Sequence, residues 1–223
     1  MALKEQTPKP HIEPRWPVVL AILVVLWLLA ILPARVRFVP VWVPFVFGIA
    51  VLLPMAGVGI TAAKARWLRV ERAITLLFVV FSGGGNLVVL AFLIRAMIFR
   101  SSEISGLQLL TSGVAVWVMN VLAFSLLYWQ IDRGGPGTRA GSANVRPDWL
   151  FPQEEAPAQD VPSGWRPVYV DYLYLGYSTA TAFSTTDVMP LTSRAKLMMM
   201  AESTISLVTL VVVAARAINI LGS

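Results

Sequence analysis

Five long apolar stretches constrain this chain more than any other feature of its sequence. They cover residues 17–33, 39–60, 73–94, 107–128 and 197–221. Each is close to the length of about 20 residues that lets an α-helix cross the hydrocarbon core of a bilayer. Charged residues make up only 13% of the chain, whereas soluble domains contain about 25%. The sequence therefore predicts an all-α membrane protein with five transmembrane helices.

The first apolar stretch has a second interpretation, because a cleaved signal peptide also combines a polar tail with an apolar run. The run at residues 17–33 is long for a signal peptide, and residues 32–35 lack the usual small-residue cleavage pattern. We therefore expect the first transmembrane helix here, with Trp16 near the membrane interface.

The third stretch carries a glycine cluster at its centre, formed by Gly83, Gly84 and Gly85. Small residues let transmembrane helices approach one another closely, so a packing face or a kink is the first interpretation. A ligand-binding break in the helix is the alternative.

Polar segments divide the chain into four regions. We expect a polar N-terminal tail at residues 1–16, a four-helix transmembrane region at 17–131, a hydrophilic loop at 132–167 and a final region at 168–223. Residues 64–72 are expected to link the second and third helices. Tyr128 and Trp129 are expected at the membrane interface, where aromatic residues are enriched.

The segment at residues 168–190 differs from the five apolar stretches. Its first half is aromatic, and its second half is rich in hydroxyl groups and ends in Asp187 and Pro190. A helix that enters the membrane and returns as an extended stretch fits this pattern, because such backbone survives at membrane depth only against protein or water. We therefore expect a re-entrant, pore-loop-like element before the last helix.

The second half of this segment resembles the selectivity filter of potassium channels. Residues 181–190 align without gaps to the pore signature T-T-V-G-Y-G-D-x-x-P, and Thr181, Asp187 and Pro190 match its threonine, aspartate and proline. The resemblance implies a pore helix before the filter, an inner helix after it and several copies of the chain around one axis, with a homotetramer favoured.

The filter-like segment departs from the signature at both glycines, which are replaced by Ser184 and Thr186. In potassium channels the backbone carbonyls of the filter replace the hydration shell of the ion, and glycine permits the backbone turns that this requires. We expect hydroxyl groups of Ser184, Thr185 and Thr186 to line the narrow part, with a ring of Asp187 carboxylates at its mouth. This arrangement predicts weak selectivity among monovalent cations.

Three tracts in the second half of the chain also resemble an uncharacterised family of small bacterial inner-membrane proteins. They are SLLYWQIDRGG at residues 125–135, DYLYL at 171–175, and STTDV at 184–188 with its following Thr192, Ser193 and Arg194. This resemblance implies the bacterial inner membrane as the location and implies no activity.

The distribution of Lys and Arg predicts the orientation in the membrane, because positive residues favour the cytoplasmic side. With five spans, one side carries Arg35, Arg37, Arg95, Arg100 and Arg216, and the other carries the remaining 13 of the 18 basic residues. The N-terminus is therefore expected in the cytoplasm, and the re-entrant element enters from that side, unlike in potassium channels. If residues 168–190 cross the bilayer instead, the chain has six spans and both termini inside.

Two ionisable residues, Glu202 and Arg216, lie in the last apolar helix. Both could sit near opposite headgroup layers, with Arg216 extended toward the interface. Alternatively Glu202 lies beside the filter, because ionisable residues within a membrane usually face the bundle interior or water. Ser203, Ser206 and Thr209 add polar groups to this helix, and such groups more often bond their own backbone or pack against neighbours than line a pore.

The residue inventory disfavours several other classes of function. The chain has no Cys and a single His, His11, in the polar tail, so we expect no cofactor, no metal site and no enzymatic activity. The net charge of +6 is interpreted as a topology signal and not as a nucleic-acid surface. We expect a homo-oligomeric, weakly selective cation channel. The alternatives are a non-conducting structural or accessory protein and a small transporter.

Overall fold

The structure is a computed structural model, and it describes residues 13–32, 40, 42–60, 65–99, 106–141, 145–183 and 187–221. The chain is mostly helical. Its long elements are α1 (Trp16–Ile31), α2 (Trp42–Ile60), α3 (Ala65–Phe99), α4 (Gly106–Ile131), α7 (Tyr169–Ala182) and α8 (Ser193–Leu221). Its short elements are the 3₁₀ helix η1 (Asp132–Gly134), α5 (Pro136–Arg139), β1 (Trp149–Leu150), α6 (Pro152–Glu155) and β2 (Met189–Pro190).

Among the described residues, three helices are long and apolar enough to span a membrane. The spanning segments are Arg66–Ala96, Leu107–Gly134 and Ser193–Ala215, and the apolar helices α1 and α2 are shorter. These helices indicate an integral membrane protein, and the prediction of an all-α membrane protein is confirmed at this level.

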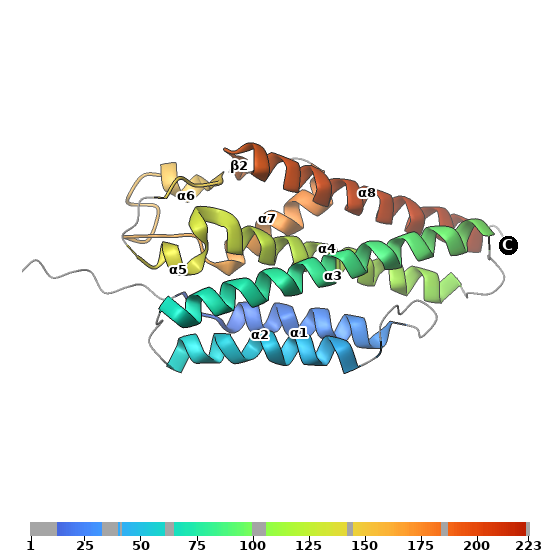
Figure 1. Ribbon diagram of the computed structural model, residues 1–223. Helices are drawn as coiled ribbons and strands as arrows, with labels where there is room; N and C mark the ends of the chain where they lie inside the picture. The colour runs from blue at the N-terminus through green and yellow to red at the C-terminus, as the bar shows by residue number, and fades with distance from the viewer. Residues whose placement is uncertain are drawn as a thin grey trace, which may run out of the picture.

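The helices form one elongated bundle (Figure 1), in which α4 has contacts with α1, α3, α7 and α8. Helices α1 and α2 lie together on one side, α3 crosses the middle and α8 lies on the opposite side. Helix α4 packs against α3, α7 and α8, and it is the most buried of the three spanning segments. The core is built from its apolar face, where Val116, Met119 and Leu126 are almost completely buried.

The expectation that residues 64–72 form a link is wrong, because α3 already begins at Ala65. The charged residues of this segment lie on the first turns of the helix. Glu71 is buried and forms an ion pair with Arg15 at 2.8 Å, and Arg72 donates to the carbonyl oxygen of Gly134 at 2.6 Å. Contacts with distant parts of the chain therefore continue the helix beyond its apolar stretch.

Helix α7 and helix α8 both begin at the end of the bundle that carries α5 and α6 (Figure 1). Helix α7 has 14 residues and is about 21 Å long at 1.5 Å per residue, shorter than the hydrocarbon core of about 30 Å. After it the chain turns back, and β2 pairs antiparallel with β1, which aligns Pro190 with Trp149. Helix α7 thus ends partway along α8, where the Ser203 hydroxyl of α8 donates to the carbonyl oxygen of Thr179 at 3.2 Å.

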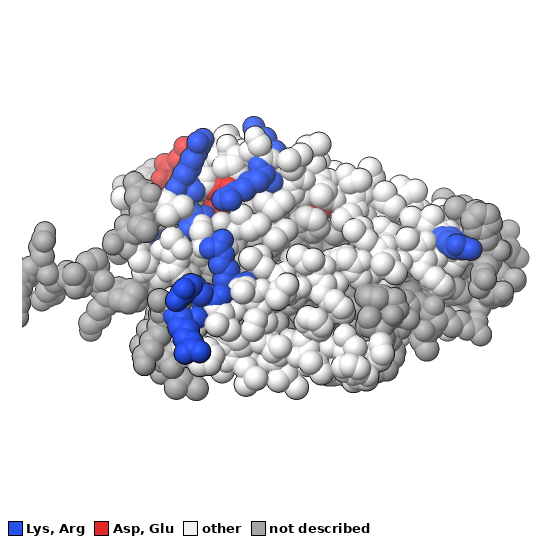
Figure 2. Space-filling model, viewed as in Figure 1, with Lys and Arg blue, Asp and Glu red and all other residues white. Residues whose placement is uncertain are grey.

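Positive side chains gather at the same end of the bundle, and one isolated group lies near the other end (Figure 2). Arg66, Arg69 and Arg72 are on the first turns of α3, whereas Arg95 is near its last residue. The cap formed by residues 132–141 and 145–167 adds further arginines to the charged end.

The glycine cluster of α3 makes no close helix contact at two of its positions. A Cβ atom placed on Gly83 or Gly84 would have no neighbour within 4 Å. Nearby, the Asn86 amide of α3 donates to the carbonyl oxygen of Val116 in α4 at 3.0 Å. Side-chain hydrogen bonding joins the two helices here.

Candidate functional site in the bundle interior

The predicted filter residues are described only in part. Thr181 lies in the last turn of α7, is exposed and donates to the carbonyl oxygen of Tyr177 at 2.7 Å. Ser184, Thr185 and Thr186 lie outside the described residues. Asp187 is exposed, and its carboxylate accepts a hydrogen bond from the Tyr174 hydroxyl at 2.8 Å.

The polar residues predicted on the last helix mostly face inward. Glu202, Ser206 and Thr209 are at most 1% exposed. The Thr209 hydroxyl donates to the carbonyl oxygen of Ile205 at 2.7 Å, and Ser203 is half-buried against α7. The buried side chains of Glu202, Ser206 and Thr209 therefore lie in the interior of the bundle and do not form an exposed polar stripe.

Glu202 is the centre of a polar cluster between α4 and α8. Its carboxyl oxygen Oε2 accepts a hydrogen bond from the Tyr128 hydroxyl at 2.5 Å. The Asn120 amide donates to the carbonyl oxygen of Glu202 at 3.1 Å and to the Ser206 hydroxyl at 2.9 Å. The second carboxyl oxygen of Glu202, Oε1, is buried and has no hydrogen-bond partner among the residues that the structure describes.

Helix α7 completes this cluster through Gly176, which is buried. A Cβ atom at this position would lie 2.5 Å from Oγ of Ser125, 3.2 Å from Oε1 of Glu202 and 3.2 Å from the carbonyl oxygen of Val121. A Cβ atom at 2.5 Å from the hydroxyl oxygen would force the Ser125 side chain or α7 to shift, so glycine allows α7 to pack this closely against α4 and α8. Helix α7 therefore packs directly against the Glu202 carboxyl group.

Sequence reasoning singled out Glu202 but missed its partners. Tyr128 and Trp129, predicted at the membrane interface, are both 0% exposed inside the protein. The Tyr128 hydroxyl donates to the Glu202 carboxyl group, and the Trp129 indole donates to Glu13 at 2.7 Å. One signal was present: Asn120 and Tyr128 are eight residues apart, about two helical turns, and so share a face of α4.

A second polar network lies at the charged end of the bundle. The Arg139 guanidinium forms an ion pair with Glu13 at 3.0 Å and donates to the carbonyl oxygens of Trp129 and Asp132 at 2.9 Å. Burial works to lower the pKa of Arg139, but neighbouring Tyr172 and Glu13 outweigh it and raise this pKa above its ordinary value. Arg139 therefore stays charged, and it joins residues 13–15 to the cap.

The same network anchors the beginnings of α7 and α8. The Tyr172 hydroxyl of α7 donates to Asp132 at 2.6 Å, and the backbone N–H of Asp148 donates to the same carboxylate at 2.8 Å. Asp148 in turn accepts two hydrogen bonds of 2.6 Å from Arg194 and one of 2.6 Å from Thr192. The cap thus fixes where α7 and α8 each begin.

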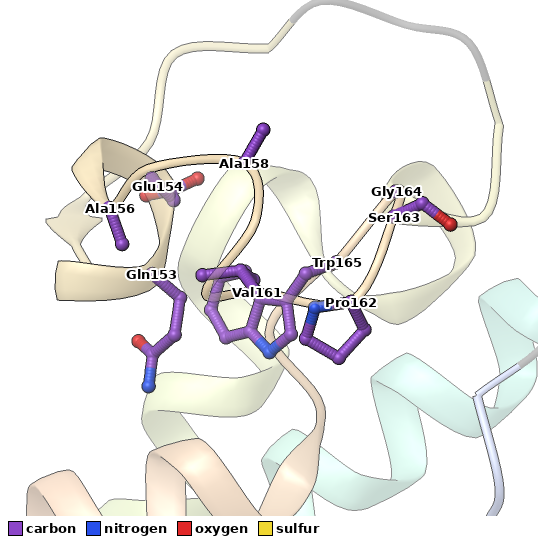
Figure 3. Close-up of a pocket in the computed structure, with 9 residues that line it drawn as sticks. All are labelled: Gln153, Glu154, Ala156, Ala158, Val161, Pro162, Ser163, Gly164 and Trp165. Atoms are coloured by element: carbon purple, nitrogen blue, oxygen red, sulfur yellow. The ribbon is translucent and has the colours of Figure 1, made fainter.

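One surface cavity lies in the cap and another lies beside the end of α7. The cap holds a cavity of about 360 Å³ in which the Trp165 ring, Pro162 and Gln153 form the lining (Figure 3). A groove of about 520 Å³ lies beside the end of α7 and is lined by Thr179, Phe183, Lys196 and residues of α8. Neither gathers a set of catalytic groups. Among the described residues, no group of three His, Asp or Glu side chains is placed to hold a metal ion.

Comparison with known proteins adds no relative to this description. No protein-family model, no curated protein and no solved structure matches the chain.

Proposed function

We propose that this protein is a homo-oligomeric pore-loop cation channel, with a tetramer favoured. One observation carries the proposal: α7 ends beside the middle of α8 and the chain then returns to the end where α7 began. This order of half-length helix, return segment and full-length helix is that of a pore helix, a filter and an inner helix. Thr181 and Asp187 lie on the protomer surface beside it.

The need to satisfy backbone groups supports an oligomer around this element. The last carbonyl groups of a helix have no partner within the helix, and in lipid such groups must be shielded by protein or water. Copies of the chain arranged around α7 and residues 187–192 would supply both. The negative end of the α7 dipole and the Asp187 carboxylates would then face one axis, where they attract cations.

The proposal includes five transmembrane helices, a cytoplasmic N-terminus and a bacterial inner-membrane location. The gathering of positive side chains at the end where α7 begins supports this orientation. In this orientation the proposed re-entrant element enters the membrane from the cytoplasm. In this Cys-free chain, Ser163→Cys in the cap should resist a membrane-impermeant thiol reagent added to intact cells. Ser102→Cys, between α3 and α4 in sequence, should react, and the opposite pattern would overturn the orientation.

Cation flux tests the channel directly. Purified protein in liposomes should conduct monovalent cations, and Asp187→Asn should reduce this flux strongly at low ionic strength and weakly at high salt, because salt screens surface charge. Asp160→Asn is the matched control, since Asp160 is an exposed carboxylate in the cap. Wild-type protein that conducts nothing over a range of voltage and pH would refute the channel, as would a monomer in mild detergent.

A non-conducting structural or accessory protein is the second candidate function. It is favoured by the inward orientation of Glu202, Ser206 and Thr209, which gives the protomer no exposed polar stripe from these residues along α8. The same flux measurement separates the two candidates, because an accessory protein alone would leave the liposomes sealed.

A further inference from the structure

Glu202 is an ionisable group that the proposed pore does not use. It lies within a membrane-spanning segment of α8 and is 0% exposed. No ion pair among the described residues includes it. Within the described part of the chain, its carboxyl group receives one side-chain hydrogen bond, from Tyr128, and Oε1 has no partner.

This set of contacts suits a neutral carboxylic acid and not a carboxylate. A buried carboxylate without a cation is so unfavourable that the group takes up a proton instead. Tyr128 of α4 is the ionisable group that faces it, and it serves as the donor. Helix α7 faces it with Gly176 and α4 adds Ser125 and Asn120, none of which carries charge.

We propose that Glu202 is a proton-binding site in the bundle interior that is occupied at neutral pH. In this state Oε2 is the carbonyl oxygen that accepts from Tyr128, and Oε1 carries the proton on the side facing Gly176. The neutral acid lets α7 pack against α4 and α8. Loss of the proton would leave a negative charge beside the buried backbone of α7 at Gly176. The bound proton therefore stabilises the packing of α7 against α4 and α8. This site stands whether or not the protein conducts ions.

Infrared spectroscopy of the purified protein in lipid tests the site. At pH 7 the wild-type protein should show the carbonyl stretching band of a protonated carboxylic acid, and Glu202→Gln should lose that band completely. Glu71→Gln is the matched control, because Glu71 is also buried in a spanning helix but is paired with Arg15. That variant should keep the full band.

A second variant makes the test independent of how well Glu202→Gln folds. Tyr128→Phe removes the hydrogen bond to Oε2, so the same band should persist and shift to higher frequency. A wild-type spectrum without the band at pH 7, a band retained in Glu202→Gln, or a band unmoved in Tyr128→Phe would each overturn the proposal.

Discussion

Two buried polar regions of the bundle differ in the partners that their carboxyl groups have. At the charged end, Glu13 and Glu71 are each paired with an arginine. In the bundle interior, Glu202 has a tyrosine hydroxyl and no cation among the described residues. In the first region, ion pairs join distant segments of the chain. In the second region, an uncharged carboxyl group allows α7 to pack against α4 and α8. Burial alone therefore does not define the role of an acidic residue in this protein.

The largest effect on stability is expected where one of these buried ion pairs loses a partner. Arg139→Met removes the closest cation from the buried Glu13 carboxylate and leaves it the Trp129 indole as a donor and Arg15 at 3.9 Å. Removing one partner of a buried ion pair costs about 3–5 kcal/mol, so thermal unfolding in detergent should shift strongly downward. Arg69→Met, which removes an exposed arginine, should change little.

A double variant sharpens this prediction. Adding Glu13→Gln to Arg139→Met removes a buried charge that then has only the distant contact with Arg15 among its ion pairs in the described residues, so part of the lost stability should return. If Arg139→Met unfolds like Arg69→Met, or if the double variant is as unstable as the sum of its parts, the charged end is not held by this pair.

A smaller loss is expected from Gly176→Ala, which tests the neutral region. The added methyl group would collide with Oγ of Ser125, and overpacking of this kind costs about 1–3 kcal/mol. Gly84→Ala is the control, because that helical glycine is exposed and open; there alanine should be neutral or slightly stabilising. Equal behaviour of the two variants in thermal unfolding would contradict the packing described for α7.

The two regions also differ in how far the sequence predicts them. Apolar length predicted helices close to α1, α2, α4 and α8, because a helix in lipid is dictated by its own composition. The start of α3 was mistaken for a link, since the partners that stabilise it there, Arg15 and Gly134, are distant in sequence. The pair between Glu13 and Arg139 spans 126 residues and leaves no local pattern.

The neutral region was partly predictable for a similar reason. A charge in an apolar stretch, as at Glu202, is visible in the sequence alone. Its dependence on Gly176 is not, because the contact joins three helices and a single glycine has many possible roles. The filter role of Ser184, Thr185 and Thr186 stays a prediction.

A moderate effect is expected where the charged end holds α8. Arg194→Gln removes two hydrogen bonds to the buried Asp148 carboxylate. Hydrogen bonds to charged groups contribute about 1.5–3 kcal/mol, and the loss should be at the lower limit because the Arg194 side chain is 60% exposed. Lys196→Gln, two residues along α8 and also exposed, should unfold like the wild type. A loss in Lys196→Gln as large as in Arg194→Gln would assign the effect to general charge and not to Asp148.

The smallest effect is expected at the hydrogen bond between Tyr174 and Asp187, which belongs to neither buried region. Both residues are exposed, and substitutions at such sites usually change stability by about 0.5 kcal/mol or less. Tyr174→Phe and Asp187→Asn should therefore both unfold at nearly the wild-type temperature, in contrast to Arg139→Met. If stability is unchanged, Asp187→Asn is a valid test of conduction. A change in flux would then reflect the missing charge and not a displacement of residues 187–192. A large loss of stability in either variant would mean that this bond anchors the turn after α7, and Asp187 would join the structural carboxylates of the charged end.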